Sequence, residues 1–172
     1  SFSEKVIILI FKNGGSVTAG NSSGINDGAS FVIVASEEMV DKYNLPVLAE
    51  IVAIGQAALD PNYMGLGPVP AIKSTLNAAK MKLSEMDLIE LNEAFASQSI
   101  GVVTELAEEH DLTMEEIFAR TNVNGGAIAL GHPLGCTGAK LTVQLIHEMK
   151  RRNSKYGMVT MCIGGGMGAA AI

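Results

Sequence analysis

One segment of sixteen residues, 124–139, constrains the fold of this chain more than any other. Its sequence, NGGAIALGHPLGCTGA, holds five glycines and is predicted to join a strand to a helix. Within it, Gly131 and Pro133 flank His132. Glycine tolerates unusual backbone angles, and proline keeps the residue before it out of the helical region, so the backbone aims the histidine ring.

A second reactive side chain, Cys162, follows His132 by thirty residues and stands at the start of a glycine turn. Cysteine and histidine can act as a nucleophile and its base, or as an acid–base pair, if the fold brings them together. The N–H groups of the turn, which begins at Gly164, could hold an oxyanion beside the thiol. Asn92 does not titrate near neutral pH and therefore suits the positioning of water or substrate.

Each of these residues also has a structural interpretation. A lone buried cysteine is most often a small apolar residue, and Cys136 keeps that interpretation. A histidine before a proline is more often a plain loop residue. The glycine-rich segment 18–29 could line a ligand cleft with its backbone groups or could be a connector, and its composition does not decide between the two.

Apolar periodicity and turn residues predict an α/β fold. From residue 46 the order is β-α-β-α-β-α-β-β, which indicates a mostly parallel sheet with helices on both faces and one antiparallel strand. The dipeptide Leu45-Pro46 divides the chain into 1–45 and 46–172. Strands are predicted over 6–11, 30–35, 47–54, 87–91, 123–129, 156–163 and 167–172, and helices over 36–43 and 139–152, around 72–79, after Ala96 and after Thr113.

Three polar side chains converge in this arrangement. In open α/β sheets, ligands bind at the loops that follow the carboxyl ends of the strands. Asn92, His132 and Cys162 each lie at or just after the end of a predicted strand. We therefore expect an active site at this edge of the sheet.

Composition and charge narrow the classes of function. The net charge of −6 argues against a nucleic-acid surface. The two cysteines, Cys136 and Cys162, lie in glycine-rich motifs, which fits reduced thiols in the cytoplasm better than a disulfide framework. The apolar run 6–11 is too short to span a bilayer or to form a signal core, so no membrane association is expected. Because the chain starts with Ser1 and this run follows at once, we expect a fragment of a longer protein.

Four motifs together resemble the thiolase family, in the family's order and over nearly the whole chain. They are TAGNSSGINDG at 18–28, NEAFA at 92–96, NGGAIALGHP at 124–133 and CIGGGMG at 162–168. The resemblance implies two similar halves, each a five-stranded mixed sheet with helices on both faces. It also implies that this chain holds the end of the first half, to about residue 45, and all of the second half.

The resemblance implies acyl transfer between coenzyme A thioesters, either cleavage of a 3-ketoacyl-CoA by CoA or the reverse Claisen condensation. In this scheme His132 activates a nucleophilic cysteine and helps to form an oxyanion hole, and Asn92 holds a water molecule in that hole. Cys162 is the acid/base that moves the α-carbon proton, and Gly164 gives an N–H to a second oxyanion hole. The residues implied in the pantetheine channel are Ser23, Met64, Ala94, Phe95, Ala19 and Phe11.

The chain departs from the family pattern in two respects. The family's acyl-accepting cysteine lies in the first half, most of which is missing here, and neither cysteine of this chain occupies its motif. Residues 107–120 also look longer than in compact relatives and carry an extra charged helix, expected at the surface. We therefore expect the missing N-terminal half as a partner, homo-oligomers, acyl-CoA as substrate, and neither a metal nor a permanently bound cofactor.

Two other hypotheses stay open. The chain could be a non-catalytic CoA-binding or dimerising fragment, which the absent nucleophile favours. It could also be a cysteine hydrolase that uses Cys162 and His132, although such nucleophiles are usually carried on helices. Whatever its activity, a half-thiolase would expose the apolar face that normally meets its other half, and we expect the isolated chain to self-associate.

Overall fold

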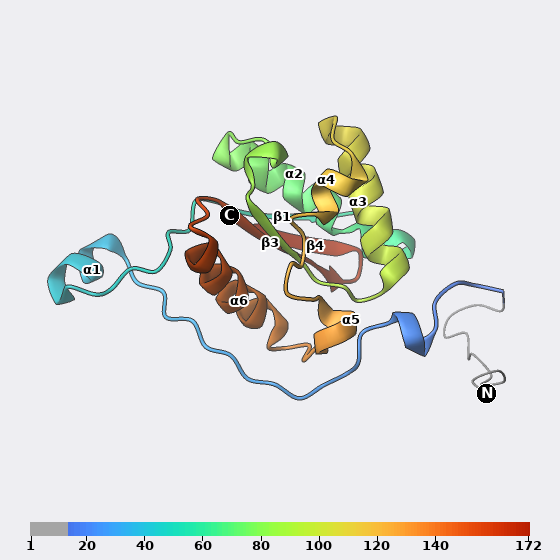
Figure 1. Ribbon diagram of the computed structural model, residues 1–172, viewed down its shortest axis with the longest axis horizontal. Coiled ribbons are helices and arrows are strands. Elements are labelled where there is room, and N and C mark those ends of the chain that lie inside the picture. Colours follow the sequence, from blue (N-terminus) through green and yellow to red (C-terminus); the bar gives the residue numbers. More distant parts are fainter. Residues whose placement is uncertain (1–13) are drawn as a thin grey trace.

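The computed structural model describes residues 14–172, so the strand predicted over 6–11, with Phe11, lies outside the described residues. Figure 1 shows a sheet with helices packed on both of its faces. The helices are α1 (Glu37–Tyr43), α2 (Pro68–Ala79), α3 (Ala96–His110), α4 (Met114–Phe118), α5 (Ala127–Leu130) and α6 (Thr137–Arg152), with 3-10 turns η1 (Ala19–Asn21), η2 (Pro61–Leu66) and η3 (Leu83–Glu85). The strands are β1 (Ile54–Ala58), β2 (Leu88–Leu91), β3 (Gly157–Gly164) and β4 (Met167–Ala171).

The strands form one sheet in the order β1-β4-β3-β2. β2 and β3 are parallel, whereas β4 is antiparallel to both of its neighbours, β1 and β3. The prediction of a mixed α/β sheet with one reversed strand is thus confirmed. Three of the four strands, β1, β2 and β3, run in the same direction, as predicted, but only the β2–β3 pairing is parallel because the reversed strand β4 lies between β1 and β3.

Two hydrophobic cores lie on opposite faces of the sheet, because successive side chains of a strand point to opposite faces. Ile89 and Met158 join the larger core, under α2, α3 and α4. Their neighbours Leu88 and Val159 join the smaller core with Leu141 and other residues of α6. This alternation explains why both faces need a helical cover.

Two predicted strands are not found at their expected positions. The apolar run 47–54 is almost wholly exposed, and β1 forms instead over the smaller residues that follow it. A Cβ at Gly55 would collide with Thr75 of α2, so the close approach of the helix selects small residues here. The run 30–35 is also not a strand, because it has no hydrogen-bonded partner strand within the described part of the chain.

The predicted strand 123–129 is a turn followed by α5, which leaves four strands among the described residues instead of five. A trace of the fifth strand remains as a parallel bridge between Ile89 of β2 and Thr121. The chain leaves this ladder at Asn122, whose left-handed backbone (φ 50°) interrupts the extended conformation.

Two short helices, α1 and α4, were predicted well by their capping residues. Ser36 Oγ accepts a hydrogen bond from the N–H of Met39 at the start of α1. Thr113 and Glu116 form the reciprocal capping box expected at the start of α4. The extra helix α4 lies at the surface, anchored by the buried Ile117.

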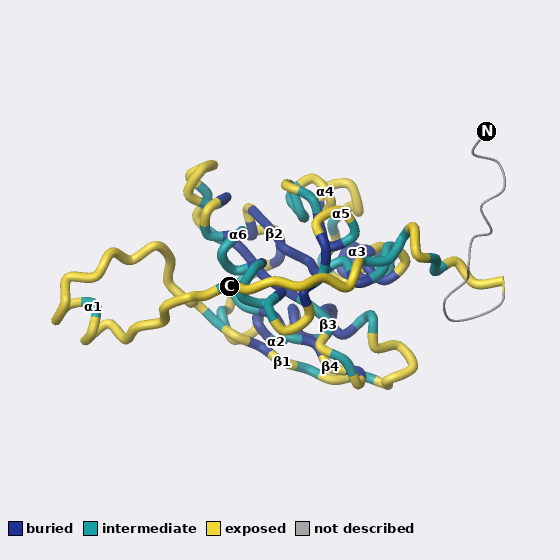
Figure 2. Tube along the Cα trace, turned by 90° about the horizontal axis from the view of Figure 1, so that it is seen from below, coloured by how far each residue is buried: buried dark blue, intermediate teal, exposed yellow. Residues whose placement is uncertain are grey.

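The segment 24–54 runs along the outside of the molecule, where Figure 2 shows it as a long exposed trace that contains α1. Phe31 and Ile33 are 88% and 93% exposed, and they belong to a longer series of exposed apolar residues. Many of the exposed large apolar side chains of the described residues therefore lie on this extended segment.

Candidate active site

Asn92 and His132 meet at one end of the sheet. The side-chain amide Nδ2 of Asn92 lies 3.4 Å from Nε2 of His132. Asn92 follows β2 directly, and its N–H donates to the carbonyl of Thr160 in β3. The side chain is 1% exposed, and its Oδ1 is buried without a hydrogen-bond partner among the described residues. A buried acceptor of this kind suits a water molecule or a substrate group.

The other nitrogen of the His132 ring, Nδ1, lies 2.7 Å from Oγ1 of Thr137, in the first turn of α6. The Thr137 hydroxyl donates its own proton to the carbonyl of Pro133 at 3.0 Å, so it can only accept from His132. The neutral ring is therefore protonated at Nδ1, which leaves Nε2 free to accept from Asn92. Burial and the nearby charge of Lys140 lower the pKa of His132, and both effects favour this neutral form.

The backbone around His132 is fixed by the glycine-rich segment near the start of the described chain. His132 donates its N–H to the carbonyl of Gly24 at 3.0 Å, and Ile25 forms a parallel bridge with it. Gly131 has φ +91°, and a Cβ there would collide with the side chain of Asn26. Glycine is therefore required before the histidine for both backbone angle and space.

The same segment brings several of the implied pantetheine residues together. Ser23 donates to the carbonyl of Ala94 from both its N–H (3.0 Å) and its hydroxyl (3.2 Å). Ser22 forms an antiparallel bridge with Phe95. Segment 18–29 is thus more than a connector, because it docks on both motifs that carry Asn92 and His132.

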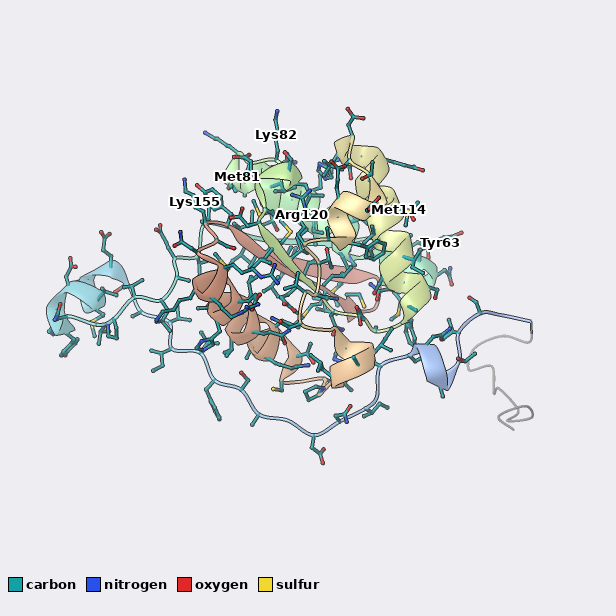
Figure 3. The ribbon with its side chains drawn as sticks, viewed as in Figure 1. Tyr63, Met81, Lys82, Met114, Arg120 and Lys155 are labelled. Atoms are coloured by element: carbon teal, nitrogen blue, oxygen red, sulfur yellow. The ribbon has the colours of Figure 1, made fainter. Side chains whose placement is uncertain are left out.

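The structure places the remaining pantetheine candidates on separate elements. Ala19 is exposed in η1. Met64 is 37% exposed in η2, which packs beside α3, as the position of its neighbour Tyr63 shows (Figure 3). Phe11 lies outside the described residues.

Cys162 is half-buried on β3, two residues beyond the Thr160 carbonyl that holds Asn92. The β3–β4 pairing shifts register between Cys162 and Gly164, and the turn 164–166 then has positive φ at all three glycines. A Cβ on Gly164 would meet nothing within 4 Å, so open space lies beside this residue. Burial raises the pKa of the Cys162 thiol, which keeps the thiol protonated near neutral pH.

Two charged groups near the site were not singled out from the sequence. Glu90 of β2 is 2% exposed, and burial raises its pKa from 4.5 to about 7 against the opposing charge of Lys140. Lys140 of α6 donates to the carbonyl of Gly131 at 3.1 Å. The spacing of Thr137 and Lys140 could have indicated their role, because residues three apart lie on one face of a helix and this helix begins directly after the glycine-rich segment.

Residues 14–172 contain no cluster of three or more His, Cys, Asp and Glu side chains that could hold a metal ion. Across the same residues no helix has the length and apolar character needed to cross a membrane.

Comparison with known proteins identifies the family. The chain matches the model of the thiolase C-terminal domain over residues 45–172 and that of the thiolase N-terminal domain over residues 3–38. It is 51% identical over 162 residues to an acetyl-CoA acetyltransferase of Syntrophomonas wolfei, covering 94% of this chain and 39% of that protein. It is also 51% identical over 163 residues to human mitochondrial 3-ketoacyl-CoA thiolase, covering 95% and 39%.

Solved structures agree. The acetyl-CoA acetyltransferase of Bacillus anthracis superposes with a TM-score of 0.86 at 46% identity, over 96% of this chain and 40% of that one. Human mitochondrial 3-ketoacyl-CoA thiolase in complex with CoA gives a TM-score of 0.81 at 44% identity, over 96% and 40%. The chain belongs to the thiolase family and spans about two fifths of the length of these relatives.

Proposed function

We propose that this chain supplies the acid–base part of a site for acyl transfer between coenzyme A thioesters. The contact that carries the proposal is Asn92–His132–Thr137, which presents an unprotonated Nε2 next to the unpartnered Oδ1 of Asn92. Nε2 would take the proton of an attacking thiol and then, as Nε2–H, donate to the oxyanion that forms. Oδ1 would hold a water molecule that donates its second proton to the same oxyanion.

The nucleophile in this scheme is a cysteine thiol from a part of the family's fold that these 172 residues do not match. In thiolysis it attacks the keto carbon of a 3-ketoacyl-CoA, and the bond between that carbon and the α-carbon breaks. The α-carbon of the leaving acetyl-CoA enolate takes the proton of Cys162. The thiol of free CoA then gives its proton to the Cys162 thiolate and displaces the acyl group from the nucleophile, which takes its own proton back from Nε2. A thiol that is protonated at neutral pH suits the donor role of Cys162.

The substrate in this proposal is acyl-CoA, with no metal and no permanently bound cofactor. Its pantetheine arm would run past the docked pair Ser23 and Ala94, then past the other implied residues. Gly164 would offer its N–H to a second oxyanion hole, since open space lies beside it. The implied pantetheine residues beyond the docked pair are Ala19, Met64, Phe95 and Phe11.

The proposal extends to partners and location. The exposed apolar segment 24–54 would be covered by the rest of a thiolase fold and by a second copy in a homo-oligomer. Two free cysteines in the described chain suit a reducing compartment, and we propose the cytoplasm. Because some relatives are named as mitochondrial, cell fractionation would decide this point.

The alternative function is a non-catalytic CoA-binding or dimerising fragment, which the exposed apolar segment and the unmatched nucleophile favour. A hydrolase that uses Cys162 as its nucleophile is less well supported, because the raised pKa of this thiol reduces its thiolate fraction.

Thiolysis of acetoacetyl-CoA tests the proposal, measured with this chain alone and with the complete protein that contains it. We expect turnover only from the complete protein, and a loss of roughly 10²- to 10⁴-fold in kcat in His132→Ala and in Cys162→Ala. His147→Ala is the matched control, because His147 is exposed on α6. Full activity of His132→Ala would contradict the proposed roles, and CoA binding without turnover by the complete protein would favour the alternative.

A further inference from the structure

The two segments that carry Asn92 and His132 are joined by a group of polar contacts outside the site itself. Asn122 lies at its centre, at the point where the chain leaves the edge of β2. Its Oδ1 accepts from the N–H of Leu91 at 2.9 Å, and its Nδ2 donates to the carbonyl of Leu91 at 2.8 Å. The side-chain amide thus replaces a peptide group of the missing neighbouring strand, immediately before Asn92.

Glu93 completes the connection on the other side of Asn92. Its Oε1 accepts from Nδ2 of Asn122 at 3.0 Å, and its Oε2 accepts from the N–H of Ile128 in α5 at 3.3 Å. The carboxylate lies so close to Gly126 that a Cβ there would collide with it. Both protons of the Asn122 amide are used, one on Leu91 and one on Glu93.

We propose that Glu93 and Asn122 are positioning residues for acyl transfer, a clamp that fixes the separation between Asn92 and His132. This inference rests on the proposed function. The clamp holds the residues on both sides of Asn92, and it holds α5, whose last residue is followed by Gly131 and His132. It therefore links segments 91–93 and 122–128 through side chains.

The geometry of the site makes such a link necessary. The Asn92–His132 contact, at 3.4 Å, is at the long end of the hydrogen-bond range, so a small increase in separation removes it. α5 has only four residues and contributes one side chain, Ala127, to the buried apolar set. Apolar packing alone gives such a short helix little positional restraint, and polar contacts with defined directions supply it.

The role of Glu93 depends on its being a carboxylate. Both of its contacts are accepted hydrogen bonds, from Asn122 and from a backbone N–H. In Glu93→Gln one of the two oxygens becomes an NH₂ group. Whichever oxygen is replaced, the NH₂ group then faces a donor, either Nδ2 of Asn122 or the N–H of Ile128, and has to turn away. In Glu93→Asp both acceptors remain, but they are withdrawn by one methylene.

Glu116 provides a matched control on the same chain. Its carboxylate also accepts from a backbone N–H and from a side-chain donor, both of Thr113, at the start of α4. Both donors reach one oxygen, Oε2, so Glu116→Gln removes a comparable carboxylate charge from a comparably short helix while its amide oxygen can keep both contacts. Neither residue of that cap contacts Asn92 or His132.

The experiment uses the complete protein with Glu93→Gln, Glu93→Asp and Glu116→Gln. For Glu93→Gln we expect kcat for acetoacetyl-CoA thiolysis to fall roughly 10- to 100-fold, while KM changes by less than about threefold. Glu93→Asp recovers part of kcat, and Glu116→Gln keeps both constants. A crystal structure of each variant measures the Nδ2–Nε2 separation, which we expect to increase only in the Glu93 variants.

The outcomes separate the clamp from the proposed function. A wild-type kcat in Glu93→Gln, or a reduced kcat with the 3.4 Å contact unchanged, would overturn the clamp. If the wild-type protein does not turn over, the proposed function fails, and the separation in the crystal structures still tests the clamp. If Glu93→Gln does not fold, Glu93→Asp is judged by the same two measurements.

Discussion

The hydroxyl of Thr137 gives the sharpest test of how the histidine is held. Thr137→Val removes this hydroxyl and keeps the shape of the side chain, which is 1% exposed in the first turn of α6. The Pro133 carbonyl loses one donor but keeps the backbone N–H groups of Cys136 (2.8 Å) and Thr137 (2.9 Å). Only the Nδ1–H of His132 is left without its partner.

The expected loss of free energy follows from this one unpaired donor. A donor left unsatisfied in a partly buried place costs about 1–3 kcal/mol. The ring also loses its reason to be protonated at Nδ1, and the other tautomer would point Nε2–H at the Nδ2 donor of Asn92. If the loss of free energy is felt in the transition state, it corresponds to a fall in kcat of roughly 5- to 150-fold.

Thiolysis of acetoacetyl-CoA and thermal unfolding of the complete protein measure this prediction. Thr142→Val is the matched control, because Thr142 lies on the same helix and its hydroxyl donates to the carbonyl of Gly138 at 2.9 Å. Thr137→Ser restores the hydroxyl and should restore most of kcat. The reasoning is refuted if Thr137→Val loses no more activity than Thr142→Val, or if Thr137→Ser is as impaired as Thr137→Val.

Two further predictions concern charge. Lys140→Met removes a cation that, together with burial, lowers the pKa of His132, so we expect this pKa to rise. The acidic limb of the kcat/KM profile should then move to higher pH, whereas Lys140→Arg should leave it in place. Glu90 binds its proton more tightly in the folded protein, with a pKa of about 7 against an ordinary 4.5, so its contribution to stability is largest below pH 4.5 and is lost as pH rises to about 7. In Glu90→Gln this decline, about 3 kcal/mol at most, should disappear from unfolding measurements between these pH values, whereas the exposed Glu108→Gln should keep it.

Much of the fold could be predicted because its signals are local. The strand pair over 156–163 and 167–172 is nearly as predicted, since three glycines with positive φ form the turn between β3 and β4. The cap of α4 needs only Thr113 and Glu116, which are three residues apart. Where an element depends on residues near it in sequence, the pattern of the chain contains the necessary information.

The failures have a common cause in distant contacts. Residues 47–54 and 30–35 have the apolar, β-branched composition of strands, but a strand also needs a neighbour with free hydrogen-bonding groups. β1 finds that neighbour in β4, more than a hundred residues later in the chain, and α2 then restricts its side chains to small ones. Neither condition can be derived from the composition of the segment itself.

The site was predicted in the same uneven way. Asn92, His132 and Cys162 were singled out from their motifs and from their expected positions at strand ends. The structure brings the first two into contact, although His132 follows α5 rather than a strand. Thr137, Glu93 and Lys140 were not singled out, because each has an adequate local explanation as part of a helix or its start. Each of them contacts residues that are distant in sequence or in another segment, and apolar periodicity gives no information on such hydrogen bonds.

The overall fold and the geometry of the site thus depend on different interactions. Apolar burial requires a helical cover on both faces of the sheet, and the sequence pattern predicted that cover. The relative placement of Asn92 and His132 instead depends on directional polar contacts between loops, such as those of Glu93 with the N–H of Ile128 and of His132 with the carbonyl of Gly24. Because each such contact has a narrow range of length and angle, a few of them can fix a site on short loops that a hydrophobic core would leave free to shift.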